Sequence, residues 1–155
     1  AAAGADAIII ACFDDPALDD ARARVSIPVL GIGEAGFHAA MMLGGRFSVV
    51  TTLPVAIPIL EDNLHHYGLA PACARVRAAG IKVLDLEDEN SGAVAKVSAE
   101  IARAKAEDDV GAIVLGCAGM ADLAAKPEAE HGLKVIDGVG AAAAFAAALI
   151  NLRRV

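Results

Sequence analysis

Aromatic and basic residues are scarce in this chain of 155 residues. Aromatic residues make up 3% of it, with four Phe, one Tyr and no Trp. The core must therefore be built mainly from Ala, Val, Ile and Leu, and such small side chains suit helices packed closely on a parallel sheet. The formal net charge is −7, and the sequence has no basic cluster and no aromatic stacking platform. A nucleic-acid-binding surface is therefore not expected.

Cysteine and metal-binding motifs are also sparse. The three cysteines cannot all pair, and the acidic chain shows no secretory signal, so we expect free thiols and a cytoplasmic protein. The four histidines show no ligand spacing and no Cys-x-x-Cys pair occurs, so no metal site is expected. The apolar run from Val139 to Leu149 is too short to span a bilayer, and we expect no membrane partner. The chain does not begin with Met, and we expect it to be the downstream part of a longer protein.

Apolar runs alternate with helical patterns, which predicts βα units and a parallel sheet. Strands are expected at residues 7–11, 28–32, 47–51, 73–76, 112–116 and 134–136. Helices are expected at residues 14–23, 35–43, 54–67, 91–107, 120–130 and 140–152, the first with two acidic residues and a proline at its positive end. Residues 84–90 carry four acidic side chains, and we expect a solvated loop there.

Two cysteines end two closely similar apolar runs. Cys12 closes the run Ala-Ile-Ile-Ile-Ala-Cys, and Cys117 closes the run Ala-Ile-Val-Leu-Gly-Cys. Two near-copies in one chain indicate duplicated βα units, and ligands bind outside the carboxyl ends of parallel strands. We therefore expect both sulfurs to face a shared cleft. A pair of opposed thiols there can remove a proton from one face of a carbon and return it on the other.

The alternative role for both cysteines is packing, because free cysteine is among the most buried residue types.

The chain after each of the two cysteines bears on the thiol pKa. A helix is expected directly after Cys12 and after Cys117. The unpaired N–H groups at the start of each helix would lower the thiol pKa and favour the thiolate. Cys73 stands at the beginning of a predicted strand, away from the carboxyl ends, so packing is expected there.

Three further motifs follow predicted strands. Thr51 and Thr52 end one strand, so one hydroxyl is expected to point into the cleft, although strand propensity also explains two β-branched residues. Asp137 is expected to be a turn residue. The letters Gly-Ile-Gly-Glu-Ala-Gly, from Gly31 to Gly36, match the dinucleotide pattern G-x-G-x-x-G. Because the pattern alone is weak and the next strand lacks the acidic residue at its end, a nucleotide-binding module is kept only as an alternative of another class.

Several segments together carry a family resemblance. They are residues 11–19 (Ala-Cys-Phe-Asp-Asp-Pro-Ala-Leu-Asp), 31–36, 46–54 (Arg-Phe-Ser-Val-Val-Thr-Thr-Leu-Pro), 84–88 (Leu-Asp-Leu-Glu-Asp), 114–121 (Val-Leu-Gly-Cys-Ala-Gly-Met-Ala) and 135–139 (Val-Ile-Asp-Gly-Val). In this order they resemble the hydantoin and allantoin racemases, members of the wider aspartate/glutamate racemase group. The resemblance covers essentially the whole chain.

The resemblance implies an α/β fold of two pseudo-symmetric lobes, with mainly parallel sheets flanked by helices and a cleft between the lobes. The first lobe would comprise residues 1–46 and 138–155, and the second residues 47–137. The family begins with a strand and an Asn-Pro-Asn-Thr loop that this sequence lacks, so the first lobe is expected to be incomplete at its N-terminus. Family members commonly form homo-oligomers, and we expect the same here.

The resemblance also implies a racemase that needs no cofactor, with Cys12 and Cys117 as the catalytic acid/base thiols. The residues implied to line the substrate site are Phe13, Thr51, Thr52, Ala118 and Gly119. The expected reaction inverts C5 of a 5-substituted hydantoin, allantoin included, and the expected partner is this small-molecule substrate.

Three rival interpretations remain open, two of them enzymes and one a protein without catalytic activity. An aspartate or glutamate racemase would want a cationic partner for the side-chain carboxylate, but Arg46 and Lys134 are expected at the amino ends of strands. A decarboxylase with a single catalytic cysteine would leave one of the two matched cysteines unexplained. A packing scaffold would carry two unreactive thiols.

Overall fold

The chain is an α/β structure in which strands and helices alternate. The computed structural model describes residues 4–88 and 90–153, without the side chains of residues 125 and 126. Residues 1–3, 154 and 155 of the expected first lobe and Glu89 of the expected acidic loop lie outside the described residues. The strands are β1 (Ile8–Ile10), β2 (Val29–Gly31), β3 (Phe47–Thr51), β4 (Cys73–Ala78), β5 (Ala112–Leu115) and β6 (Lys134–Asp137). The α-helices are α1 (Leu18–Arg24), α2 (Ile32–Gly44), α3 (Ile57–His66), α4 (Ala93–Glu107), α5 (Ala125–His131) and α6 (Gly138–Leu152). The short 3₁₀ helices are η1 (Pro54–Ala56), η2 (Ala70–Ala72), η3 (Val83–Leu86) and η4 (Ala118–Leu123).

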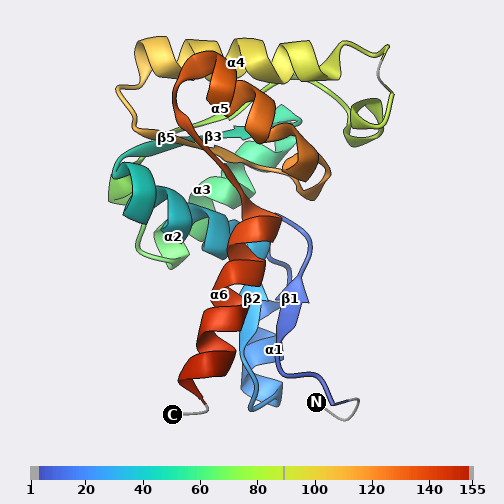
Figure 1. Ribbon diagram of the computed structural model, residues 1–155, viewed down its shortest axis with the longest axis vertical. Coiled ribbons are helices and arrows are strands. Elements are labelled where there is room, and N and C mark those ends of the chain that lie inside the picture. The colour runs from blue at the N-terminus through green and yellow to red at the C-terminus, as the bar shows by residue number, and fades with distance from the viewer. Residues whose placement is uncertain (1–3, 89, 154–155) are drawn as a thin grey trace.

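The described strands form two parallel sheets. β1 pairs with β2, and the other strands form a sheet in the order β4-β3-β5-β6. In Figure 1 the larger sheet lies between two layers of helices, with α4 and α5 above it and α2 and α3 below it. The small sheet lies toward the other end of the long axis. The prediction of an α/β fold with parallel sheets flanked by helices is confirmed. The exact limits of the two lobes stay a prediction.

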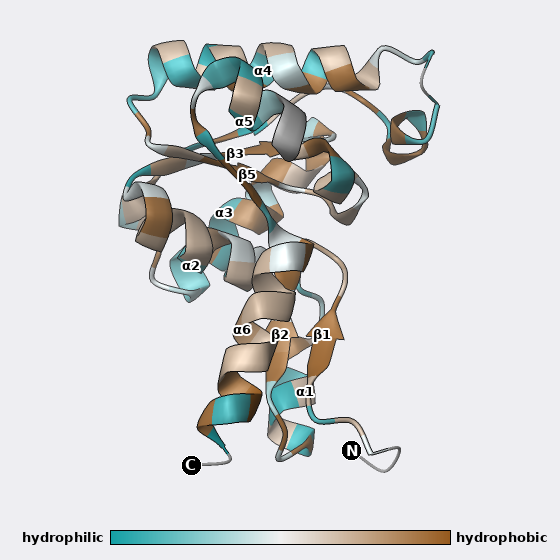
Figure 2. Cartoon of the chain, in the orientation of Figure 1, coloured by the Kyte–Doolittle hydropathy of each residue, from teal (hydrophilic) through white to brown (hydrophobic). Residues whose placement is uncertain are grey.

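The larger sheet is buried on both faces, because successive side chains of its central strands point to opposite sides. On β3, Val49 packs in the same cluster as Phe37 of α2. Its neighbour Val50 packs in a second cluster with Val97 and Ile101 of α4. In Figure 2 the strands are mostly brown, whereas teal segments lie along α4. Burial on both faces explains why the strands appear in the sequence as continuous apolar runs.

α6 connects the two sheets. Asp137 caps its first turn, where the side-chain oxygens accept hydrogen bonds from the backbone N–H groups of Val139 (2.9 Å) and Gly140 (2.7 Å). α6 then packs beside α2 and continues to β1 and β2. Asp137, predicted to be a turn residue, is thus a helix N-cap. Within the described residues, neither α6 nor any other helix combines the length and the apolar character needed to cross a bilayer.

A buried ion network joins β4 to the end of α4. The guanidinium of Arg77 on β4 donates to Asp108 (2.7 Å), Glu107 (2.7 Å) and Glu100 (3.2 Å), and the Arg77 side chain is only 3% exposed. Ser48 of β3 also donates to Asp108, at 2.7 Å. These bonds hold the pKa of Asp108 below its ordinary value, chiefly through Arg77. The stabilisation from Asp108 is therefore present at neutral pH and is lost as the pH falls through its folded pKa.

We expect Arg77→Met to lower the free energy of unfolding by about 3–5 kcal/mol, because it leaves Asp108 and Glu100 buried without a counter-charge. Urea denaturation followed by circular dichroism measures this loss. Arg75→Met is the matched control on the same strand. The Arg75 side chain is 57% exposed, and an exposed ion pair contributes about 1 kcal/mol or less. Equal effects for the two variants would show that the network does not fix β4 to α4.

Candidate active site

Cys12 and Cys117 lie beyond the carboxyl ends of strands in two different sheets. Cys12 follows β1 after Ala11 and is exposed, and Cys117 follows β5 after Gly116 and is half-buried. Cys73 begins β4, and burial raises its pKa to about 12. Because Cys73 packs against the core, the expected packing role of this third cysteine is confirmed.

The charge environment of Cys117 links it to Cys12. Burial raises the pKa of the Cys117 thiol, the backbone N–H of Gly119 opposes that effect, and the charges of Cys12 and Asp14 raise the pKa further. Cys12 is therefore one of the charged neighbours that act on the pKa of Cys117. The upward direction contradicts our expectation that a following helix would lower this pKa. η4 does begin directly after Cys117, but the cost of burying a thiolate outweighs the effect of its N–H groups.

The loop after Cys12 is not the start of a helix, which corrects the prediction of a helix from residue 14. α1 begins only at Leu18, after Ala17 in a left-handed conformation (φ 57°). The backbone N–H of Asp15 donates to the carbonyl of Cys12 (3.0 Å). The loop is therefore a tight turn, and the two acidic residues do not cap α1.

The carboxylate of Asp15 instead occupies the N-terminus of α2. One oxygen accepts the backbone N–H of Gly33 (3.0 Å), and the other accepts the N–H of Glu34 (2.7 Å) and the hydroxyl of Tyr67 (2.9 Å). Asp15 is 6% exposed. Burial raises its pKa, and the three hydrogen bonds oppose that shift. A Cβ at Gly31 would overlap the carboxyl group, so the close approach of this loop requires glycine there.

This contact gives the motif from Gly31 to Gly36 a role other than nucleotide binding. In dinucleotide-binding proteins the phosphates bind to the helix N-terminus that follows such a motif. Here Asp15, a residue of the chain itself, occupies that anion position. The nucleotide-binding alternative therefore loses the site on which it depends.

The two predicted threonines hold the strand ends around Cys117. Both are buried, and the hydroxyl of Thr51 donates to the carbonyl of Gly116 at 2.9 Å. The backbone carbonyl of Thr52 accepts the N–H of Ile81 at 3.1 Å. Because the proton of Thr51 is used in this bond, its hydroxyl oxygen is left only as an acceptor.

Two other predicted lining residues pack against the core. Phe13 is 4% exposed, and its ring meets that of Phe37 edge-on at 5.4 Å. Ala118 is half-buried against the same cluster. The side chain of Phe13 therefore anchors the loop that carries Cys12.

Sequence reasoning missed two apolar residues beside Gly119, one of the predicted lining residues. A Cβ on Gly119 would lie 3.2 Å from Cδ1 of Leu86, 3.8 Å from Sγ of Cys117 and 3.9 Å from Cγ1 of Val83. η3 therefore borders Gly119 in η4, although residues 84–90 were expected to be a solvated acidic loop. The signal available in the sequence was the apolar residues that interrupt the acidic run.

A cavity of about 780 Å³ lies elsewhere, between β2, α2 and α6, and neither Cys12 nor Cys117 lines it. Its walls are mainly apolar and include Val29, Phe145 and Leu149. In the part of the chain that the structure describes, no cluster of three or more His, Cys, Asp or Glu side chains could hold a metal ion. The two thiols and their surroundings are therefore the candidate site.

Comparison with known proteins gives consistent results. The sequence model of the Asp/Glu/hydantoin racemase family matches residues 1–146. A hydantoin racemase from Rhizobium meliloti is 48% identical over 150 residues, which cover 97% of this chain and 62% of that protein. The structure of an allantoin racemase from Klebsiella pneumoniae matches with a TM-score of 0.94 at 45% identity, over 97% of this chain and 62% of that one. An allantoin racemase from Pseudomonas fluorescens gives 0.91 at 39% identity, over 95% and 63%. The chain thus spans less than two thirds of the length of these relatives.

We expect Asp15→Ala to lower the free energy of unfolding by about 3 kcal/mol or more, because it leaves two backbone N–H groups and the Tyr67 hydroxyl without their acceptor. Chemical denaturation measures the change. Asp19→Ala, at a side chain that is 66% exposed, should stay within about 0.5 kcal/mol of the unmodified protein. A loss below about 1 kcal/mol for Asp15→Ala would contradict the anchoring role.

The pH at which Cys117 reacts with an alkylating reagent tests whether Cys12 acts on it. In Cys12→Ser, iodoacetamide should alkylate Cys117 at lower pH than in the unmodified protein, because serine removes one charge that raises the pKa of Cys117. Peptide mass spectrometry across a pH series measures the labelling of this one residue. Cys73→Ser is the control and should leave the profile unchanged. An unchanged profile in Cys12→Ser would mean that the sulfurs do not share a site.

Proposed function

Because the chain belongs to the Asp/Glu/hydantoin racemase family, we propose that it acts as a racemase on 5-substituted hydantoins, allantoin included. The curated and structural relatives reported above are named hydantoin and allantoin racemases, which supports this substrate class. An aspartate or glutamate racemase is the alternative within the family. We further propose a cytoplasmic homo-oligomer that needs no cofactor, with lobes at residues 1–46 plus 138–155 and at residues 47–137.

One observation carries the proposal more than any other. Cys12 and Cys117 extend from strands of two different sheets, and the charge of one acts on the pKa of the other. We propose that the two thiols face one bound carbon, which thiols from separate sheets can address on its opposite faces. Inversion at a carbon requires this arrangement, because the proton leaves one face and returns on the other.

The proposed reaction uses the two sulfurs as a base and an acid. One cysteine, as thiolate, removes the C5 proton and becomes a thiol. The electron pair left on C5 is delocalised onto the adjacent ring carbonyl, so that negative charge develops on oxygen. The opposite cysteine, as thiol, then donates a proton to the other face of C5 and becomes a thiolate. Each turnover therefore exchanges the protonation states of the two cysteines, and the next enantiomer is processed in the reverse direction.

Groups near Cys117 are suited to stabilising the developing charge. Backbone N–H groups at the start of η4, which Ala118 and Gly119 supply, and the hydroxyl of Thr52 are our candidates for binding the ring oxygen. Thr51 fixes the carbonyl of Gly116 and so holds the strand end in place. The raised pKa of Cys117 favours its thiol form, which is the form that donates a proton.

The charges favour a ring substrate over an acidic amino acid. Asp14 already acts on Cys117 with a negative charge. Arg46 directly precedes β3 and Lys134 begins β6, so both cations stand at the amino ends of strands, away from the end that carries Cys117. A free side-chain carboxylate would therefore meet a negative charge, whereas a hydantoin ring brings N–H donors.

We expect Cys12→Ser and Cys117→Ser each to lower racemisation by about 10²–10⁴-fold, because each removes one positioned acid or base. Each variant should still exchange the C5 hydrogen of one enantiomer with D₂O, and the two variants should prefer opposite enantiomers. Proton NMR of pure enantiomers measures exchange, and polarimetry measures inversion. Cys73→Ser should retain the full rate. Normal racemisation by either of the first two variants would rule out the two-thiol mechanism.

A further inference from the structure

The peptide group that joins Asp14 to Asp15 is hydrogen-bonded on both sides. Its N–H, which belongs to Asp15, donates to the carbonyl of Cys12 at 3.0 Å. Its C=O, which belongs to Asp14, accepts a hydrogen bond from the side-chain amide of Asn63 at 2.9 Å. The peptide bond is planar and trans, so its N–H and C=O point in opposite directions from one rigid unit. Asn63 therefore sets the orientation of the same peptide group that binds the backbone of Cys12.

The sulfur of Cys12 depends on such backbone contacts for its position. Cys12 is exposed, and so is Ala11 before it, so packing of these two side chains does not fix the loop. The turn ends at Asp15, whose φ of 49° lies in the left-handed region. A residue other than glycine rarely adopts this conformation unless its surroundings hold it there. The geometry of the turn therefore depends on contacts with other elements.

Asn63 contacts the loop from a helix that is fixed to the larger sheet. α3 buries Leu60 and Leu64, which are 0% and 2% exposed, in the core cluster on the α2 side of that sheet. Tyr67 follows α3 and donates its hydroxyl to the same loop at 2.9 Å. Cys117 follows β5 of this sheet. Asn63 thus connects the loop of Cys12 to the part of the molecule from which Cys117 extends.

We propose that Asn63 is a positioning residue for Cys12, because its bond to the Asp14 carbonyl aligns the Cys12 sulfur with C5 of the substrate. This inference rests on the proposed function. The cavity of about 290 Å³ that Asn63 borders is lined by neither Cys12 nor Cys117, so Asn63 acts through the backbone and not by binding the ring. Loss of its amide should slow the proton transfers of Cys12 and spare those of Cys117.

The test adds Asn63→Ala to each of the two single-thiol variants and measures exchange at C5 in D₂O. In Cys117→Ser, the Cys12 thiolate removes the C5 proton, the S–H exchanges with D₂O, and the same sulfur returns a deuteron to the same face. Asn63→Ala should lower this exchange about 10- to 100-fold, because small displacements of a catalytic group cost rates of this order. In Cys12→Ser, Asn63→Ala should leave the exchange by Cys117 unchanged. Proton NMR of pure enantiomers measures both rates, with whichever of 5-methylhydantoin, 5-isobutylhydantoin and allantoin the unmodified protein racemises fastest.

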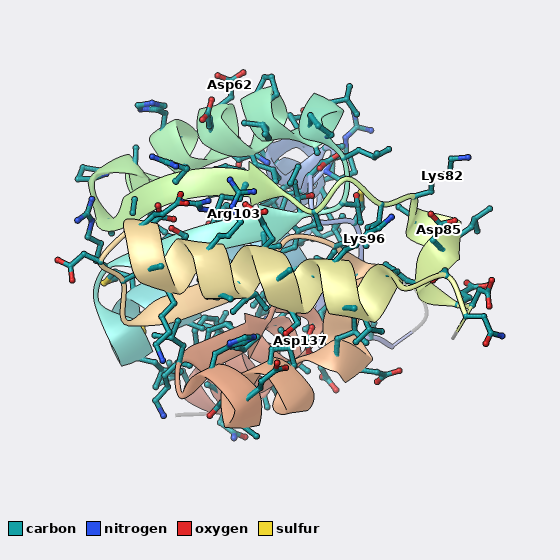
Figure 3. All side chains as sticks on the ribbon, turned by 90° about the horizontal axis from the view of Figure 1, so that it is seen from above. Asp62, Lys82, Asp85, Lys96, Arg103 and Asp137 are labelled. Carbon is teal, nitrogen blue, oxygen red and sulfur yellow. The ribbon has the colours of Figure 1, made fainter. Side chains whose placement is uncertain are left out.

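Two further variants separate positioning from folding. Asn63→Leu keeps the size and shape of the side chain without its amide, and it should reproduce the selective loss. Asp62→Ala is the matched control, because Asp62 is exposed on the same helix and lies at the margin of the molecule in Figure 3, and it should change neither rate. Alanine is a better helix former than asparagine or aspartate, so neither alanine variant should disrupt α3.

The two single-thiol variants also distinguish the possible failures. An equal loss in both would mean that Asn63 only supports the fold, and no loss in Cys117→Ser would mean that the bond does not align Cys12. Either result would overturn the inference and leave the proposed function standing. Absence of racemisation by the unmodified protein would overturn the proposed function and the inference together.

Discussion

The contact on which the candidate site depends is the one between Asp15 and the N-terminus of α2. Through Gly33, Glu34 and Tyr67 it fastens the loop that carries Cys12 to α2 and α3. Both helices pack against the larger sheet, from which Cys117 extends. The position of one sulfur relative to the other is therefore set by a buried carboxylate and not by the small sheet alone.

The same arrangement gives the two thiols different surroundings. Cys12 is exposed at the start of the turn after β1, whereas Cys117 is half-buried, and the pKa of Cys117 is raised by that burial and by its negative neighbours. The raised pKa favours the thiol form of Cys117, which is the form that the proposed mechanism uses as the acid. The family assignment and the electrostatics thus support the same proposal from independent directions.

Much of the fold follows from local patterns in the sequence. Continuous apolar runs predict the strands because both faces of the larger sheet are covered. The placement of Cys12 and Cys117 beyond strand ends is predicted because each cysteine closes such a run. Long-range partners do not appear in such patterns. Asp15 looks like a residue at the start of α1, and its bond to Glu34 spans 19 positions. Arg77 likewise binds Asp108, which lies 31 positions away in the sequence. η3 lies next to Gly119, although the acidic residues of its segment predict a solvated loop. A glycine motif that fits a phosphate also fits a carboxylate, so sequence alone could not choose between them.

The proposed mechanism requires Cys12 and Cys117 to address one carbon from opposite sides. A crystal structure of the protein with a bound 5-substituted hydantoin tests it most directly. We expect the two Sγ atoms to lie on opposite faces of the ring, each within about 3.5 Å of C5. A ring with both sulfurs on one face, or one bound in the cavity between β2, α2 and α6, would contradict it.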